Sequence, residues 1–213
     1  MSEQYLSAFA VDADALLRTV GSGDEAFVRG ALDRIGPLRA ADQLLRATEA
    51  AEVEPALREI ATGRLDPSRP GGYTWLLELL LPGAGDALGA AVLPGRGWHE
   101  LADAFEAWGL PALAGLWARP WPFPPFPRRD SAAPDDDPWP FPSLAAGPEL
   151  DRVRAELAGF DPERIHRETE LLPGGDEDAA EEVEWLLGEL LPAWTAGALE
   201  RDRGLLLLRD GGK

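Results

Sequence analysis

VEWLLGELLPAWTAGALERDRGLLLL occupies residues 183–208, and this stretch decides the fold that the sequence predicts. Its apolar side chains follow the i, i+3, i+4, i+7 and i+8 spacing of an amphipathic helix for about four turns. They are Val183, Leu186, Leu187, Leu190, Leu191, Trp194 and Ala198. Pro192 interrupts the pattern and predicts a kink, because proline cannot donate a backbone hydrogen bond. After Gly204, the run from Leu205 to Leu208 predicts a short buried strand.

The other end of the chain supplies a partner for that strand. Residues 4–11 alternate in polarity and contain aromatic side chains, which predicts an opening strand. The sequence between the two strands is mostly of helical pattern. We therefore expect an α+β fold that is predominantly helical, with a small sheet that includes the N- and C-terminal strands. The whole chain, residues 1–213, is expected to form a single domain.

Several helix boundaries can be predicted from caps and prolines. Ser22 begins the pattern Ser-Gly-Asp-Glu, so we expect it to cap a helix by accepting from the N3 amide. Pro37 is expected to restart the chain as a helix over 37–49, and Pro55 to lie in the first turn of a helix over 54–63. Residues 73–81 are apolar nearly all round, which predicts a central buried helix that ends at the following Pro-Gly pair.

Composition limits the class of partner. The chain has 38 acidic and 20 basic residues, and its formal net charge of -18 repels nucleic acid and acidic membrane surfaces. A basic protein is the partner that such a charge favours, although excess acid can also serve solubility alone. Zero cysteines exclude thiolate chemistry and suit a reducing compartment. With no apolar run of membrane-spanning length and no signal-peptide pattern at the start, the expected location is cytoplasmic.

An acidic run follows the middle of the chain. From Glu168 to Glu200 there are ten acidic residues and no lysine or arginine. Carboxylates near a helix N-terminus are explained by the helix dipole, but that effect does not extend to Glu189. Two interpretations remain open: a solvated helix face, or a docking surface for a basic partner that uses Glu181, Glu182 and Glu189.

A repeated tetrapeptide marks residues 118–148, an excursion between two helical halves that contains ten of the 20 prolines. Trp-Pro-Phe-Pro begins once at Trp121 and again at Trp139. Prolines exclude a helix or a central strand here and favour extended chain. The aromatic side chains then have two interpretations: they pack down and brace the fold, or they bind a partner.

The histidines are weighed as candidate catalytic or metal-binding residues. His166 has Glu163 and Glu170 at helical spacing, but one Glu-x-x-His motif is half of what a di-metal bundle requires. His99 with Asp103 is a weaker pair of the same kind. No serine lies in a Gly-x-Ser-x-Gly context. We therefore expect no catalytic, metal-binding or cofactor-binding residue, and the oligomeric state stays open.

Short motifs resemble an uncharacterised bacterial family of domains of unknown function. The resemblance is carried by residues 10–12, 21–24, 72–80 and 137–143. More distantly, the acid-rich helix at 183–191 and the final strand at 205–208 resemble the YfbM-like domain of unknown function. The resemblance implies a cytosolic α+β protein with its terminal strands in one sheet, and it brings no catalytic residues.

These observations favour a non-catalytic protein-interaction domain that uses an acidic surface. An alternative is an immunity or inhibitor protein that neutralises a basic toxin such as a nuclease. A further alternative is an enzyme that uses carboxylates and a histidine.

Overall fold

One sheet contains both ends of the chain in the computed structural model, which describes residues 3–41, 47–69, 72–94, 101–124 and 141–211. Its strands are β1 (Glu3–Val11), β2 (Gly85–Pro94), β3 (Phe141–Ala145) and β4 (Gly204–Gly211), in the order β2-β1-β4-β3. β1 and β4 are antiparallel, with Ala8 opposite Leu207. The expected pairing of the terminal strands in an α+β fold is thus confirmed.

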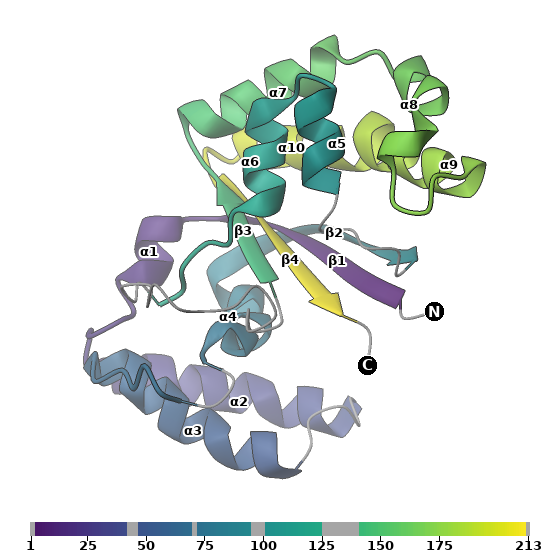
Figure 1. Cartoon of the computed structure of the whole chain (residues 1–213). Coiled ribbons are helices and arrows are strands. Elements are labelled where there is room, and N and C mark those ends of the chain that lie inside the picture. The colour runs from purple at the N-terminus through teal and green to yellow at the C-terminus, as the bar shows by residue number, and fades with distance from the viewer. Residues whose placement is uncertain (1–2, 42–46, 70–71, 95–100, 125–140, 212–213) are drawn as a thin grey trace. The chain divides into compact units, whose positions relative to one another are not determined.

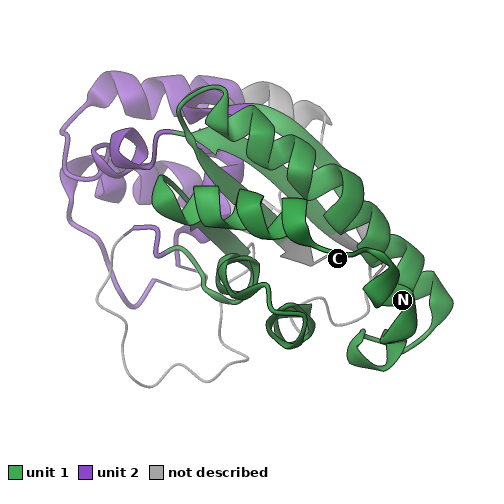
Figure 2. Ribbon diagram, turned by 90° about the horizontal axis from the view of Figure 1, so that it is seen from above, with its two compact units in different colours: residues 1–11, 87–121, 140–213 green, residues 12–86, 122–139 purple. Residues whose placement is uncertain are grey.

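The chain divides into two compact units, which are coloured separately in Figure 2. Unit 1 comprises Met1–Val11, Ala87–Trp121 and Pro140–Lys213, and unit 2 comprises Asp12–Asp86 and Pro122–Trp139. The expectation of a single domain over 1–213 stays a prediction.

Unit 1 consists of the sheet and a group of helices. Figure 1 shows α5, α6, α7 and α10 gathered over one face of the sheet. The helical segments are α5 (Leu101–Ala107), α6 (Pro111–Ala118), α7 (Pro148–Gly159), α8 (Glu163–Arg167), η4 (Thr169–Leu171), α9 (Glu177–Trp185), η5 (Leu186–Leu190) and α10 (Leu191–Leu199). Alternate strand residues such as Leu6, Leu205 and Leu207 are buried in one core with Leu191 and Trp194 of the predicted amphipathic helix. Burial of this apolar face is what fixes the helix on the sheet.

β3 contains the end of the second Trp-Pro-Phe-Pro copy. Phe141 and Pro142 begin this edge strand, and the backbone N–H of Trp121 in the first copy donates to the carbonyl of Pro142 at 2.7 Å. Proline is tolerated at an edge strand because one side of its backbone has no strand to donate to. The structure thus joins the two copies of the repeat through a backbone hydrogen bond.

A single long helix was expected over residues 183–198, and the structure divides it into three parts. α9 ends at Trp185, a π-helical turn (η5) spans Leu186–Leu190, and α10 begins at Leu191. Pro192 lies in the first turn of α10, where a missing N–H is tolerated. The expected disturbance at Pro192 therefore takes the form of a π turn just before it, because the wider turn absorbs the break in the hydrogen-bond ladder.

Unit 2 is helical. It contains α1 (Ala13–Leu17), α2 (Glu25–Ala41), α3 (Ala47–Thr62), η1 (Thr74–Leu76) and α4 (Leu77–Ala84). The turn after α1 and the end of α3 approach closely: the N–H of Gly21 donates to the carbonyl of Ile60 at 2.7 Å. A Cβ on Gly63, whose φ is +69°, would lie 3.0 Å from the Cα of Gly21. Glycine is required here by both the positive φ and the close approach.

Three boundary predictions in unit 2 are wrong. Asp24, not Ser22, caps α2, because its carboxylate accepts from the N–H groups of Ala26 and Phe27 at 2.8 and 3.1 Å. Pro37 lies inside α2 and does not begin a helix, and α3 begins at 47, not at 54. Residues 42–46 of the helix predicted over 37–49 lie outside the described residues. α3 holds Pro55 in its interior. Tertiary packing of Val53, Leu57 and Ile60 overrides the local cost of a proline.

The buried helix expected over 73–81 is confirmed in part. Tyr73, Leu76, Leu77, Leu80 and Leu81 are all buried. The segment begins as a 3₁₀ turn, and α4 continues through the Pro-Gly pair to Ala84. Of the helices that the structure describes, none has the length and apolar character needed to cross a membrane.

Candidate functional site

Exposed carboxylates and one exposed tryptophan lie together on α9 and η5. Glu181, Trp185 and Glu189 are spaced by four residues, which places them along one side of the helical segment. Trp185 is 40% exposed, and both glutamates are exposed. We call these three residues the Trp185 surface. It combines a large aromatic side chain with negative charge, the two features that a basic partner contacts most favourably.

The local sequence explains why α9 begins where it does. Asp176 accepts from the N–H of Ala179 at 3.0 Å as the N-cap, and Glu177 and Asp178 lie in the first turn. Ala179, Ala180 and Val183 face the core, so the intervening acidic side chains lie on the outer side. The acidic run is therefore the solvent side of an amphipathic helix, and its first carboxylates suit the helix dipole.

The remaining predicted contact residues have different environments. Glu182 is half-buried on α9. Trp121 is half-buried in the segment between α6 and β3, as the bracing interpretation requires. Trp139 lies outside the described residues. The bracing interpretation therefore stays a prediction.

His166 connects α8 to α9. Its Nδ1 lies 2.6 Å from Oε1 of Glu177, and its Nε2 lies 3.0 Å from Oε2 of Glu184. The two glutamates are seven residues apart, two helical turns, so they lie on one side of α9 and hold the ring between them. The hydrogen bonds that the ring makes to Glu184 and, second, to Glu177 raise the pKa of His166 above its ordinary value.

The partners of His166 differ from those expected from sequence spacing. Glu163 instead lies 3.5 Å from Arg167. Because both ring nitrogens are engaged by carboxylates, His166 has no nitrogen left to take a proton from a substrate or to bind a metal. Within the described ranges, no group of three or more histidine, aspartate or glutamate side chains has a metal-binding arrangement. His99 lies outside those ranges.

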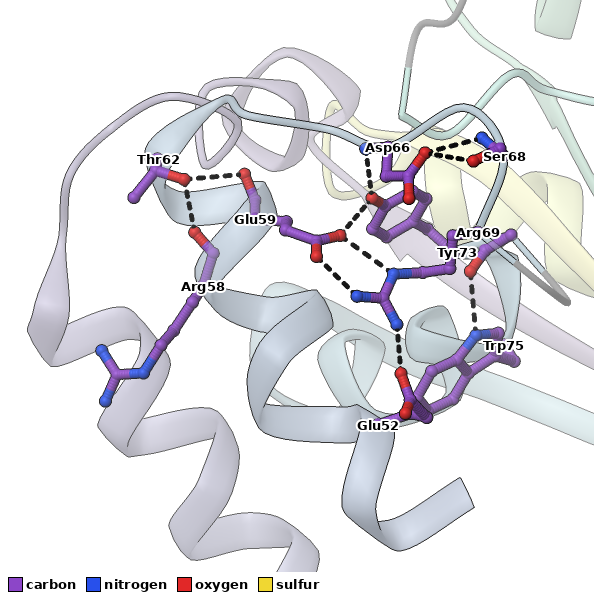
Figure 3. A network of polar contacts seen from close by, with 10 residues as sticks. Glu52, Arg58, Glu59, Thr62, Asp66, Ser68, Arg69, Tyr73 and Trp75 are labelled. Atoms are coloured by element: carbon purple, nitrogen blue, oxygen red, sulfur yellow. Dashed lines mark hydrogen bonds and ion pairs between the residues drawn. The ribbon is translucent and has the colours of Figure 1, made fainter. Parts of the chain in front are cut away.

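Unit 2 holds a polar network that sequence reasoning missed, shown in Figure 3. Arg69 donates from Nε and Nη2 to both carboxylate oxygens of Glu59, at 2.9 and 2.5 Å, and from Nη1 to Glu52. The hydroxyl of buried Tyr73 donates to Glu59 and accepts from the N–H of Asp66 at 2.8 Å. The network links the loop that carries Arg69 to α3 and η1.

The titration behaviour of this network indicates a structural role. The Arg69 hydrogen bonds, and then that from Tyr73, hold the pKa of Glu59 below its usual value. Burial, and then the Glu59 carboxylate, raise the pKa of Tyr73. Glu59, Arg69 and Tyr73 thus keep their ordinary charges at neutral pH and are already hydrogen-bonded to one another. Such a set holds a loop in place and does not offer a poised acid or base. Its hydrogen-bonded partners are 7 to 17 residues apart in the sequence, and no local motif marks them.

A buried arginine is the second feature that the sequence did not reveal. Arg209 on β4 is 6% exposed, and its guanidinium lies 4.9 Å from the ring centre of Trp117 and 4.3 Å from that of Phe141. Its Nη2 donates to the carbonyl of Trp117 at 2.5 Å. Desolvation lowers the pKa of Arg209 to about 10. The two ring faces and the carbonyl stabilise a cation that joins α6, β3 and β4.

Comparison with known proteins identifies a family. A model for a domain of unknown function, DUF7691, matches residues 1–206. No significant match was found among curated proteins or among solved structures. The expected resemblance to an uncharacterised family is confirmed, whereas the bacterial origin and the likeness to the YfbM-like domain stay predictions.

Proposed function

The chain belongs to DUF7691, a family of domains of unknown function. From the chemistry of its own surface we propose that it is a protein-interaction domain that binds a basic partner through the Trp185 surface. The observation that carries the proposal is the 40% exposure of Trp185 between two exposed glutamates. The cytosol is the setting of the proposal, since a chain without cysteine suits a reducing compartment.

An exposed tryptophan is costly to solvate and is among the residues that contribute most to protein interfaces. A lysine or arginine over its indole ring would gain a cation–π interaction, and the neighbouring carboxylates would add ion pairs at the rim. The aromatic contact would supply affinity, while the carboxylates would mainly raise the association rate and select basic partners.

The surroundings of the surface support the same charge preference. The stretch from Glu168 to Glu200 contains no basic residue that could neutralise these carboxylates locally. His166 engages Glu177 and Glu184 on α9. Glu181 lies between these two glutamates in the sequence, Glu189 lies five residues after Glu184, and both Glu181 and Glu189 are exposed to solvent. An immunity or inhibitor protein that neutralises a basic toxin would use the same surface, so this alternative is one form of the proposal. A toxicity-rescue assay distinguishes it from binding to a basic partner that is not a toxin.

The test is a comparison of variants in purified complexes. The full chain is used to isolate its partner from native cells, and the complex is then rebuilt from purified components. Trp185→Ala is expected to weaken binding roughly tenfold to thirtyfold, the range for loss of an interface anchor. Glu181→Lys with Glu189→Lys should slow association and reduce the dependence of the affinity on salt.

A matched control changes the same charge elsewhere in unit 1. Asp103 and Glu106 are exposed on α5, so Asp103→Lys with Glu106→Lys produces the same change in net charge. If this control weakens binding as much as the change at Glu181 and Glu189, net charge rather than the Trp185 surface is responsible. Full affinity in Trp185→Ala would contradict the proposal directly.

A further inference from the structure

Unit 1 contains a pocket that none of the predicted sites includes. It has a volume of about 330 Å³ and lies between the second half of α7, the turn that follows it, η5 and the start of α10. Figure 1 shows α7 beside α10. Pockets that bind small molecules begin at about this size and are mostly apolar with a few placed polar groups. This pocket follows that pattern: Leu157, Phe160, Leu187 and Pro192 supply apolar walls.

Thr195 is the fully buried polar residue of the pocket lining. The residue is 0% exposed, lines the pocket, and its hydroxyl has no hydrogen-bond partner among the described residues. A threonine inside a helix usually bonds the carbonyl three or four residues earlier, so an unpaired buried hydroxyl at this position requires an explanation. A bound molecule with a hydroxyl or carbonyl group would satisfy it, since a threonine hydroxyl can both donate and accept.

Arg154 supplies the charge. Among the residues that line the pocket it carries the one formal charge, and its side chain is 61% exposed, which places the guanidinium toward solvent. It makes a 3.0 Å ion pair with Asp151 through Nη2. An exposed pair of this kind is weak, so the guanidinium can turn to a carboxylate at the mouth. Although the chain has a net charge of -18, charges beyond about 8 Å are screened at physiological salt.

The π turn forms one side of the pocket through Leu187 and Gly188. Gly188 lies in η5 and lines the pocket, and a Cβ added there would meet no atom within 4 Å. Gly188 is exposed, so a larger side chain there would meet open space at the border of the pocket. π turns occur frequently at functional sites, because the wider turn displaces backbone and side chains toward a ligand.

We infer that this pocket binds a small monocarboxylic acid with an apolar body and a second polar group at its far end. The carboxylate pairs with Arg154 at the mouth, the apolar body contacts Leu157, Phe160 and Leu187, and the far polar group hydrogen-bonds to the hydroxyl of Thr195. This inference does not rest on the Trp185 surface, and its test leaves that surface unchanged.

Three probes separate the two polar contacts. 4-Hydroxyphenylacetate carries both polar ends, phenylacetate lacks the hydroxyl, and tyramine replaces the carboxylate by an ammonium group. Binding to the full chain is measured by calorimetry or ligand-observed NMR at 0.15 M salt. The first probe is expected to bind about threefold to tenfold more tightly than phenylacetate, the range for one neutral hydrogen bond. Tyramine should bind at least tenfold more weakly than 4-hydroxyphenylacetate.

Variants then assign the contacts. Arg154→Gln should weaken the binding of both carboxylate probes roughly tenfold. Arg152 is an exposed arginine on the same helix, and Arg152→Gln should leave the binding of these probes unchanged. Thr195→Val should remove the advantage of the hydroxylated probe without affecting phenylacetate. Gly188→Leu should fill the pocket and abolish binding of all three, with folding checked by circular dichroism.

Two results would overturn the inference. The first is absence of binding by all three probes at 10 mM. Binding at this concentration requires only about 3 kcal/mol of binding free energy. The second is binding that persists unchanged in both Arg154→Gln and Gly188→Leu. If Gly188→Leu fails to fold, the Arg154→Gln and Thr195→Val results decide the question on their own.

Discussion

Replacing Tyr73 by phenylalanine removes one hydroxyl from the centre of the unit 2 network. That hydroxyl donates to the charged carboxylate of Glu59 and accepts from the N–H of Asp66. A hydrogen bond to a charged group contributes about 1.5–3 kcal/mol. Asp66 is exposed, so water can replace the hydroxyl there. We therefore expect Tyr73→Phe to lower the free energy of unfolding of unit 2 by about 2 kcal/mol at neutral pH.

The effect should depend on pH in a defined direction. The folded-state pKa of Glu59 is lowered from its ordinary 4.5, chiefly by Arg69. A lowered carboxylate pKa stabilises the fold above the unfolded value, and this stabilisation is lost as the pH falls through the folded pKa. The difference between wild type and Tyr73→Phe should therefore be constant from pH 6 to 8 and shrink below about pH 4, as Glu59 takes up a proton.

Hydrogen exchange of the α3 amides is the suitable assay, because it reports on unit 2 without requiring the whole chain to unfold in one step. The same substitution in a Glu59→Gln background supplies the double-mutant cycle, and there the loss should fall to about 1 kcal/mol because the acceptor is neutral. A loss below about 0.5 kcal/mol at neutral pH, or one equal in both backgrounds, would refute the reasoning.

Three further predictions concern other parts of the chain. The pKa of His166 is raised by its two glutamate partners, so its contribution to stability is complete below pH 6.5 and is lost as the pH rises through the folded pKa. NMR titration of His166 should show the raised pKa. His166→Gln should abolish the pH dependence of stability in this window. Asp24→Ala should lower the free energy of unfolding by about 1 kcal/mol, because it removes the α2 cap, and Ser22→Ala should lower it clearly less. Thermal unfolding measures both losses, and equal losses would identify Ser22 as a cap of equal weight. Gly188→Ala should stabilise α9 to α10 by about 0.5–1 kcal/mol, whereas Gly89→Ala should destabilise, because the new Cβ would lie 2.6 Å from a tryptophan side chain on α10. Calorimetry of the two alanine variants should give shifts of opposite sign.

Local sequence patterns correctly predicted the elements that depend on neighbouring residues alone. Alternation and apolar runs located β1 and β4, and the apolar spacing from Val183 to Ala198 located the helical segment over α9, η5 and α10. The sequence could not decide which of Ser22 and Asp24 caps α2, because both are good caps two residues apart. The sequence also predicted that a helix begins next to Pro55, whereas α3 continues through this residue. Burial of the neighbouring side chains outweighs the local cost of the proline.

The candidate sites divide in the same way. The acidic side of α9 follows from periodicity and composition alone, because charged residues take the positions that the apolar stripe leaves to solvent. The exposure of Trp185 cannot be predicted from periodicity in the same way. Its neighbour Leu186 is fully buried, and a rotation of the helix by one residue would exchange the environments of the two side chains.

What the sequence by itself determined is a mostly helical chain with a strand at each end, the acidic character of the solvent side, and the pairing of the two terminal strands. Tertiary structure decided the rest: the partners of His166 on another helix, the network around Glu59, the aromatic contacts of Arg209 and the unpaired hydroxyl of Thr195. The physical reason is range. Periodicity and capping arise from residues within one or two turns of each other. The contacts that define these sites join residues between 7 and 92 positions apart, which meet only when the elements pack.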